Sequence, residues 1–158
     1  PVPAVVGGGS PTFGFHARLR EWQCSPGTSL FWDHGYKTAY PELPFSHAAA
    51  VLTRVISKPG THRLCLDLGH KAIASEGPAD RRIHLRGLEH AHVVGHSEEH
   101  MVLECENAEK YQVGAPLLGI PFHICPTVAL YSEATLVRDA KVTRETWEVT
   151  ARNRSLTI

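Results

Sequence analysis

A histidine and a cysteine stand two residues apart, at His123 and Cys125, between Pro121 and Pro126. They follow the apolar run of residues 116–120. In an extended chain, residues i and i+2 lie on the same face, so we expect both side chains to reach one point from the end of a single strand. Imidazole and thiolate are ligands that zinc prefers. Two protein ligands would leave positions open for water or substrate, as at a catalytic zinc.

The same pair has a second interpretation that involves no metal. The chain contains eleven histidines, so a His-x-Cys pair can arise by chance. A free cysteine also often serves as a small buried apolar side chain. The spacing by itself leaves both interpretations open.

Length and composition limit the class of protein. A chain of 158 residues is long enough for one well-buried domain and too short for two large ones. Sixteen Lys and Arg residues balance sixteen Asp and Glu residues, which argues against a nucleic-acid partner or an anionic membrane surface. No apolar run approaches the length of a membrane span.

The cysteines and the first residue bear on the compartment and on the extent of the chain. The four cysteines lie scattered, without a paired framework, at Cys24, Cys65, Cys105 and Cys125. This pattern favours reduced thiols in a cytoplasmic protein over a disulfide-stabilised secreted fold. The chain begins at Pro1 without Met, which predicts either a trimmed chain or a true N-terminus further upstream.

Residues 1–45 differ in character from the rest. The apolar residues 1–6 predict a buried strand that ends at the glycines 7–9, which a Ser and a Thr follow. Such an arrangement can expose backbone N–H groups to a phosphate, although a flexible turn is the alternative. A second turn at Pro26-Gly27 leads into a predicted aromatic strand over residues 30–33.

The sequence pattern of the remainder of the chain is typical of a β protein, and it predicts no long amphipathic helix. Short strands recur every ten to fifteen residues, with Gly or Pro between them, which is typical of a sandwich or barrel. The predicted strands are 51–56, 63–68, 83–85, 92–94, 100–105, 116–122, 134–138 and 146–151. We therefore predict a mainly β fold.

Six separated motifs together point to one family. In order, they are residues 8–12, residues 26–28 with Phe31 and Asp33, residues 51–57, residues 67–71, residues 97–100 and residues 121–127. Their order resembles the D-serine dehydratase and D-threonine aldolase family, which are fold-type III pyridoxal-phosphate enzymes related to alanine racemase. The resemblance covers nearly the whole chain, and it is carried by the order of the motifs more than by any one of them.

The resemblance implies a particular domain organisation. Members of the family have an N-terminal (β/α)8 barrel, which carries the Schiff-base lysine, and a C-terminal β domain. Residues 1–45 would then be the last strands of the barrel, and residues 46–158 a β-barrel or sandwich domain. The lysine would lie upstream, so the lysines of this chain are not candidates for it. Those lysines are Lys37, Lys58, Lys71, Lys110 and Lys141.

The resemblance also implies residues that bind the cofactor. Carried over, the phosphate of pyridoxal 5'-phosphate would be bound by Gly9, Ser10, Gly27 and Thr28. Clustered backbone N–H groups and hydroxyls are good ligands for a phosphate. The family usually has Tyr at the next position, where this chain has Ser29, so the aromatic contact of that Tyr is not carried over.

The metal and catalytic residues follow in the same way. His123 and Cys125 resemble the divalent-metal site of the family, with zinc the commonest ion. By its sequence alone, Glu98-Glu99-His100 is typical of a solvated turn; the resemblance implies His100 as a catalytic residue or as a supporting group beside the active site. The histidines that match no family motif are interpreted as surface residues; they are His84, His90, His92 and His96.

Two functions from different classes remain open. The first is the C-terminal, metal-binding part of a D-amino-acid lyase, a homodimer that eliminates water from, or aldol-cleaves, a β-hydroxy D-amino acid. The isolated chain would be inactive, because it lacks the lysine. The second is a stand-alone, non-catalytic β domain that binds a ligand or a partner chain.

Overall fold

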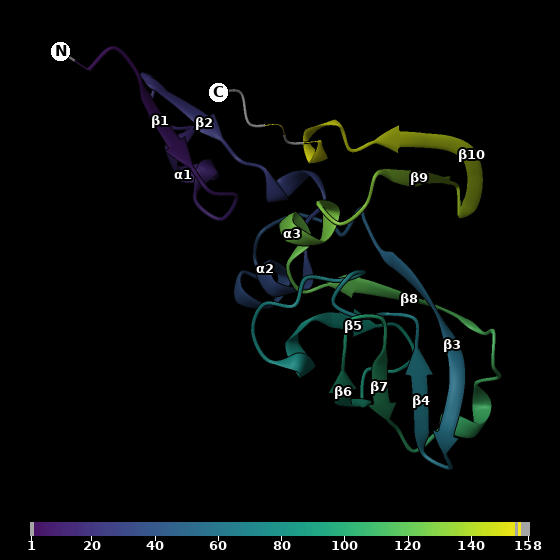
Figure 1. Cartoon of the computed structure of the whole chain (residues 1–158). Helices are drawn as coiled ribbons and strands as arrows, with labels where there is room; N and C mark the ends of the chain where they lie inside the picture. The colour runs from purple at the N-terminus through teal and green to yellow at the C-terminus, as the bar shows by residue number, and fades with distance from the viewer. Residues whose placement is uncertain (1, 154, 156–158) are drawn as a thin grey trace.

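The longest strand, β3 (Val51–Gly60), lies near the middle of a six-stranded antiparallel sheet (Figure 1). The computed structural model describes residues 2–153 and 155. The strand order is β5-β8-β3-β4-β7-β6. The other strands are β4 (Arg63–Leu66), β5 (Ile83–Leu85), β6 (His92–His96), β7 (Met101–Glu104) and β8 (Pro116–Pro121). Short 3₁₀ turns, Ala79–Arg81 and Ala108–Lys110, lie in the connections.

Alternation along these strands places one face of the sheet in the core. In β3, Val51, Thr53 and Val55 are buried and the residues between them are exposed, as the two-residue period of a strand requires. Register shifts interrupt the β3–β4 and β6–β7 pairings; irregularities of this kind bend a strand and increase its twist. The sheet therefore curls around its apolar face. The core includes Leu64, Leu66, Leu68, Ile73, Met101 and Leu103.

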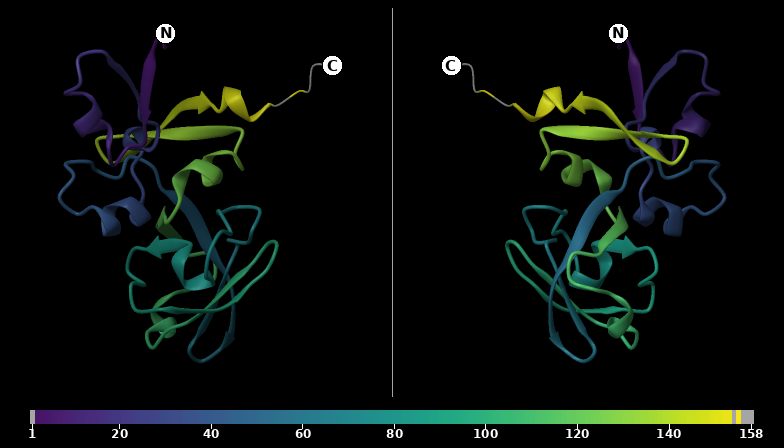
Figure 2. Two further views of the ribbon diagram at one scale, coloured as in Figure 1. Left: turned by 90° about the vertical axis from the view of Figure 1, so that its left-hand side faces the viewer. Right: turned by 90° about the vertical axis from the view of Figure 1, so that its right-hand side faces the viewer.

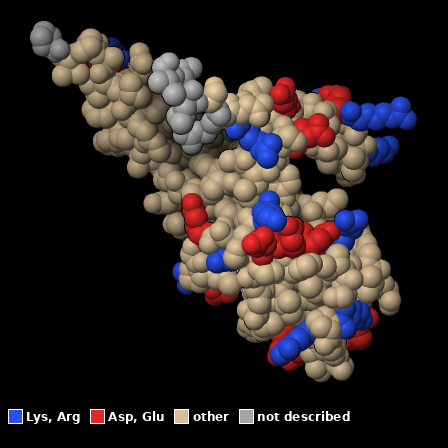
Figure 3. Space-filling view, in the orientation of Figure 1, with Lys and Arg blue, Asp and Glu red and all other residues tan. Residues whose placement is uncertain are grey.

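The N-terminal part forms a separate, parallel two-stranded sheet. Strands β1 (Val5–Gly8) and β2 (Trp22–Ser25) pair in parallel, and the short helix α1 (Phe13–His16) lies between them in the chain. A helix that connects two parallel strands is the unit from which a (β/α)8 barrel is built. On the face that Figure 3 shows, this part carries few charged side chains, whereas charged side chains gather over the six-stranded sheet and the C-terminal hairpin.

The C-terminal part is a hairpin that lies apart from the six-stranded sheet. Helix α3 (Ile124–Val128) follows β8. Strands β9 (Glu133–Arg138) and β10 (Lys141–Glu148) come next and, within the described residues, pair only with each other. A 3₁₀ turn, Thr150–Arg152, follows. The two views of Figure 2 place this hairpin on the same side of the six-stranded sheet as β1 and β2.

The predicted aromatic strand over residues 30–33 is wrong. A 3₁₀ turn, Thr28–Leu30, and the helix α2 (His34–Ala39) occupy this region. Asp33 is the reason, because its side chain accepts a hydrogen bond from the Tyr36 N–H at 2.8 Å and so caps the helix. Trp32 is fully buried and takes a positive φ of 50°, which turns the chain into the helix.

The fold class predicted from sequence is confirmed. The chain is mainly β, with an antiparallel β domain preceded by a parallel β-α-β unit. The division of the chain at residue 46 stays a prediction. Of the helices in the described part of the chain, none is long and apolar enough to cross a membrane.

Candidate functional site

The two turns predicted to bind phosphate lie next to each other. Because β1 and β2 are parallel, the residues that follow them meet at one edge of their sheet. The Ser29 N–H donates to Ser10 Oγ at 2.9 Å, and this bond joins the turn at Gly9 to the turn at Gly27. Gly9 has a φ of +87°, a conformation that glycine adopts without strain. The structure thus brings all four predicted cofactor residues, including Thr28, into one region.

The polar groups of these turns suit an anion. Ser10 and Thr28 are both buried. Ser10 Oγ accepts from a backbone N–H, so its own hydroxyl proton can be donated to a further acceptor. A Cβ on Gly27 would meet no atom within 4 Å, so this turn is open on that side. Backbone N–H groups and hydroxyls gathered in turns of this kind are suitable ligands for a phosphate.

Asp33 connects this region to the segment between β8 and α3. Its carboxylate is 2% exposed and accepts from the Tyr36 N–H at 2.8 Å and from the Ile124 N–H at 3.1 Å. The Gly35 N–H also donates to the Phe122 carbonyl at 3.1 Å. A Cβ on Gly35 would lie 2.5 Å from that oxygen, so the close approach requires glycine. The starts of α2 and α3 are therefore held together.

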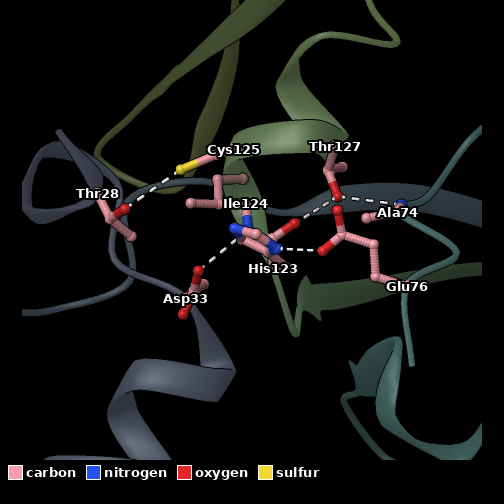
Figure 4. Close-up of polar contacts among 8 residues, drawn as sticks. All are labelled: Thr28, Asp33, Ala74, Glu76, His123, Ile124, Cys125 and Thr127. Atoms are coloured by element: carbon pink, nitrogen blue, oxygen red, sulfur yellow. Dashed lines mark hydrogen bonds and ion pairs between the residues drawn. The ribbon is translucent and has the colours of Figure 1, made fainter. Parts of the chain in front are cut away.

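The expected extended geometry of His123 and Cys125 is wrong. β8 ends at Pro121, His123 is the extended residue before α3, and Cys125 lies in the first turn of that helix. Pro126 is tolerated there, because an N–H in the first turn has no partner within the helix. Residues i and i+2 therefore do not share a strand face. In Figure 4, the Cys125 sulfur points toward Thr28 and the His123 ring points toward Glu76.

Each of the two side chains has a neighbour that the sequence did not indicate. Cys125 Sγ lies 3.2 Å from Thr28 Oγ1, and His123 Nδ1 lies 2.6 Å from Glu76 Oε2. Both residues are exposed. Within residues 2–153, no group of three or more His, Cys, Asp or Glu side chains is arranged to hold a metal ion. One imidazole and one thiol are a suitable donor pair for zinc, so binding by His123 and Cys125 stays a prediction.

Thr127 links α3 to the loop that follows β4. Its side chain is buried, and its hydroxyl donates to the His123 carbonyl at 2.8 Å and accepts from the Ala74 N–H at 3.2 Å. The second bond spans 53 positions of sequence. It places residues 74–78 beside His123.

A cleft of about 500 Å³ opens between α2, this loop and the end of β8. Its lining combines aromatic rings, two acids, two arginines and the predicted metal ligand His123. The residues that define it are Asp33, Tyr36, Tyr40, Glu76, Arg81, Arg82, Phe122 and His123. The cleft gives a small molecule a path to the exposed face of His123.

His100 lies on the turn between β6 and β7. The Ser97 N–H donates to the His100 carbonyl at 2.9 Å. An ion pair between Lys71 Nζ and Glu99 Oε1, at 2.6 Å, also ties this turn to the segment that follows β4. In the described residues, no hydrogen bond or ion pair joins the His100 side chain to His123 or Cys125. The catalytic role of His100 stays a prediction.

The interpretation of the remaining histidines as surface residues is half wrong. His90 and His92 are exposed, but His84 and His96 are half-buried. His84 stacks on His34, with ring centroids 4.3 Å apart. His96 Nε2 lies 2.9 Å from the Leu68 carbonyl. Burial, which outweighs this bond, lowers the pKa of His96 below its ordinary value.

Comparison with known proteins identifies relatives over most of the chain. Residues 48–137 match the family model described as "Putative serine dehydratase domain". The chain is 30% identical to a D-threonine aldolase from Arthrobacter sp over 152 residues, which are 94% of this chain and 39% of that enzyme. An uncharacterized protein from Mycobacterium bovis is 32% identical over 122 residues, which are 75% of this chain and 91% of that protein.

A solved structure agrees with these matches. The D-threonine aldolase from Filomicrobium marinum superposes with a TM-score of 0.77 at 29% identity, over 94% of this chain and 40% of that enzyme. The chain spans about two fifths of the length of the two aldolases. The family match covers more than half of the chain and confirms the resemblance drawn from the six motifs. The chain belongs to the serine dehydratase domain family.

Proposed function

We propose that this chain is the C-terminal, metal-binding part of a pyridoxal-phosphate-dependent lyase that eliminates water from, or aldol-cleaves, a β-hydroxy D-amino acid. Family membership and the likeness to D-threonine aldolases support the proposal. In it, residues 1–45 are the last part of the cofactor-binding barrel and residues 46–158 are the β domain. The whole enzyme is a homodimer that requires the upstream lysine for activity.

The observation that carries the proposal is the contact between Thr28 and Cys125. Their Oγ1 and Sγ atoms lie 3.2 Å apart, although the residues are 97 positions apart in sequence. Thr28 belongs to the turn that fits a phosphate, and Cys125 to the predicted metal pair. The contact therefore supports a cofactor site and a metal site that share one active centre.

Each residue of this centre has a role that its chemistry permits. Ser10 and Thr28 would hold the phosphate through hydroxyl and backbone donors. His123 and Cys125 would hold zinc, with water or substrate at the remaining positions. When bound, the cofactor acidifies the substrate Cα–H and the metal polarises the β-hydroxyl. His100 remains the proposed catalytic group on the β6–β7 turn.

Replacing each of two cysteines tests the metal assignment. We expect the chain to bind one zinc ion, Cys125→Ala to lose tight binding, and Cys65→Ala to retain it. Cys65 is the matched control because it lies in β4, paired opposite Val102 and away from α3. Zinc content after dialysis and competition with a chelator are the measurements. Equal zinc content in Cys125→Ala and the parent chain would overturn the assignment.

Turnover in the full-length protein tests the catalytic part. With pyridoxal 5'-phosphate and D-threonine or D-serine, Cys125→Ala should lower turnover far more than it lowers the unfolding midpoint. Cys65→Ala should change neither. If Cys125→Ala lowers both in proportion, Cys125 acts through stability and the catalytic assignment fails.

The second candidate function is a stand-alone, non-catalytic β domain. The relative from Mycobacterium bovis favours it, because the match covers 91% of that protein and only 122 residues. The genomic sequence before Pro1 distinguishes the two candidates. An upstream barrel with a lysine in the same reading frame supports the lyase, and its absence supports the stand-alone domain.

A further inference from the structure

Glu76 lies directly against the predicted metal ligand His123. Its Oε2 is 2.6 Å from His123 Nδ1, the distance of a strong hydrogen bond. Nδ1 donates in this contact, because an ionised carboxylate can only accept. In the neutral imidazole the bond therefore leaves the lone pair of Nε2 for another partner. In Figure 4 the side chains of Glu76 and His123 point toward each other from two different segments of the chain.

The backbone around Glu76 is fixed by the same residue that fixes His123. The Thr127 hydroxyl donates to the His123 carbonyl and accepts from the Ala74 N–H. Two residues after Ala74, the Glu76 side chain returns to the His123 ring. Both the main chain and the ring of His123 are thus tied to one loop. Because the main chain and the ring are each held by a hydrogen bond, the ring has little freedom to rotate.

We propose that Glu76 is a positioning residue that holds His123 in the tautomer and orientation required to bind zinc through Nε2. The proposal rests on the proposed metal role of His123 and Cys125. A carboxylate on the far nitrogen of a metal-binding imidazole fixes its tautomer, orients the ring and raises its basicity as a ligand. No residue motif indicated Glu76, which stands 47 positions before His123.

A purely stabilising role for the pair is the competing explanation. The side chains of His123 and Glu76 are 49% and 63% exposed. Exposed ion pairs of this kind contribute little to the stability of the fold. We therefore expect the bond to affect metal affinity, through the orientation of the His123 ring, more than it affects stability. Removing it should change metal affinity while the unfolding midpoint stays nearly constant.

Zinc titration of three variants tests the proposal. Glu76→Ala should weaken zinc binding by about 10- to 100-fold, the usual effect of losing such a partner. Glu76→Gln should recover most of the affinity, because its amide oxygen still accepts from Nδ1–H. Glu104→Ala is the control, since it removes a similarly exposed acid, paired with Arg63 on the six-stranded sheet. It should bind zinc like the parent chain.

The tautomer of His123 provides a readout that does not depend on metal. In the metal-free chain at a pH where His123 is neutral, nitrogen NMR shifts should report the proton on Nδ1. In Glu76→Ala the proton should move largely to Nε2, and in Glu76→Gln it should stay on Nδ1. An unchanged tautomer in Glu76→Ala overturns the proposal.

The outcomes separate this inference from the proposed function. If zinc binding needs Cys125 but is equal in Glu76→Ala and Glu104→Ala, the role of Glu76 is refuted and the metal site stands. If Cys125→Ala binds zinc like the parent, the metal site fails, and with it the role of Glu76 toward a metal. Weaker binding in Glu76→Ala, recovery in Glu76→Gln and the tautomer change together establish the role.

Discussion

Replacing Asp33 by Ala should destabilise the chain more than replacing any exposed acid. The Asp33 carboxylate is 2% exposed and accepts two backbone hydrogen bonds, from Tyr36 at the start of α2 and from Ile124 at the start of α3. Alanine keeps neither bond. The substitution therefore removes a helix cap and leaves a second N–H, on the 3%-exposed Ile124, without an acceptor.

The magnitude follows from these two losses. Losing a side-chain N-cap costs about 1 kcal/mol. Leaving a buried N–H group unsatisfied costs about 1–3 kcal/mol. The free energy of unfolding of Asp33→Ala should thus fall by roughly 2–4 kcal/mol. Asp33→Asn offers a single acceptor oxygen and should lose about half of that amount.

Urea unfolding followed by circular dichroism measures the effect, with linear extrapolation to water. Asp80→Ala is the control: Asp80 is exposed and makes no capping bond at its 3₁₀ turn. Its effect should stay within about 0.5 kcal/mol. If Asp33→Ala and Asp80→Ala unfold at the same urea concentration, the two hydrogen bonds of Asp33 to α2 and α3 contribute nothing to stability, and the reasoning is refuted. If Asp33→Asn matches the parent, one of the two hydrogen bonds of Asp33 contributes nothing to stability.

Two further predictions concern pH. Burial raises the pKa of Asp67, but hydrogen bonds from Arg54 and Thr53 outweigh burial and hold the pKa below its ordinary value. The ionised Asp67 carboxylate therefore stabilises the folded chain above about pH 4, and this stabilisation is lost as pH falls through the folded-state pKa. Asp67→Asn should therefore flatten the acid side of the stability profile, and equal acid slopes in urea unfolding would contradict this. Burial, followed by the charge of His84, lowers the pKa of His34, so the unfolded state binds more protons and stability falls as pH drops through about 6.5. His34→Gln should reduce this fall in thermal unfolding between about pH 7.5 and 5.5, and an unchanged profile would refute it.

The strand pattern of the β domain could be predicted from sequence because it depends on neighbours along the chain. The short β-branched and apolar run of β3 predicts a strand with one buried face, and the structure buries every second residue, Val51, Thr53 and Val55. The order of six motifs likewise identified the family, which the match over residues 48–137 confirms. The strand pattern depends on neighbouring residues, and the family resemblance depends only on the order of motifs along the chain.

Local conformation was predicted wrongly where distant residues decide it. Residues 30–33 have the composition of a strand, but the chain turns at Trp32 because Asp33 caps α2 and also accepts from the distant Ile124 N–H. Cys125 lies in a helix instead of an extended segment, because Asp33 accepts from the first N–H of α3 and the Thr127 hydroxyl donates to the His123 carbonyl while it accepts from the distant Ala74 N–H. These bonds join positions up to 91 residues apart.

By itself, the sequence determined the β character of the chain, its family and the residue types available for chemistry. Only the tertiary structure decided which of these residues meet. The contact between Thr28 and Cys125 and the bond between Glu76 and His123 span 97 and 47 positions. No periodicity or spacing encodes such pairs, because they depend on the path of the backbone through the whole fold. A side chain acquires its chemical role from the neighbours that this path supplies.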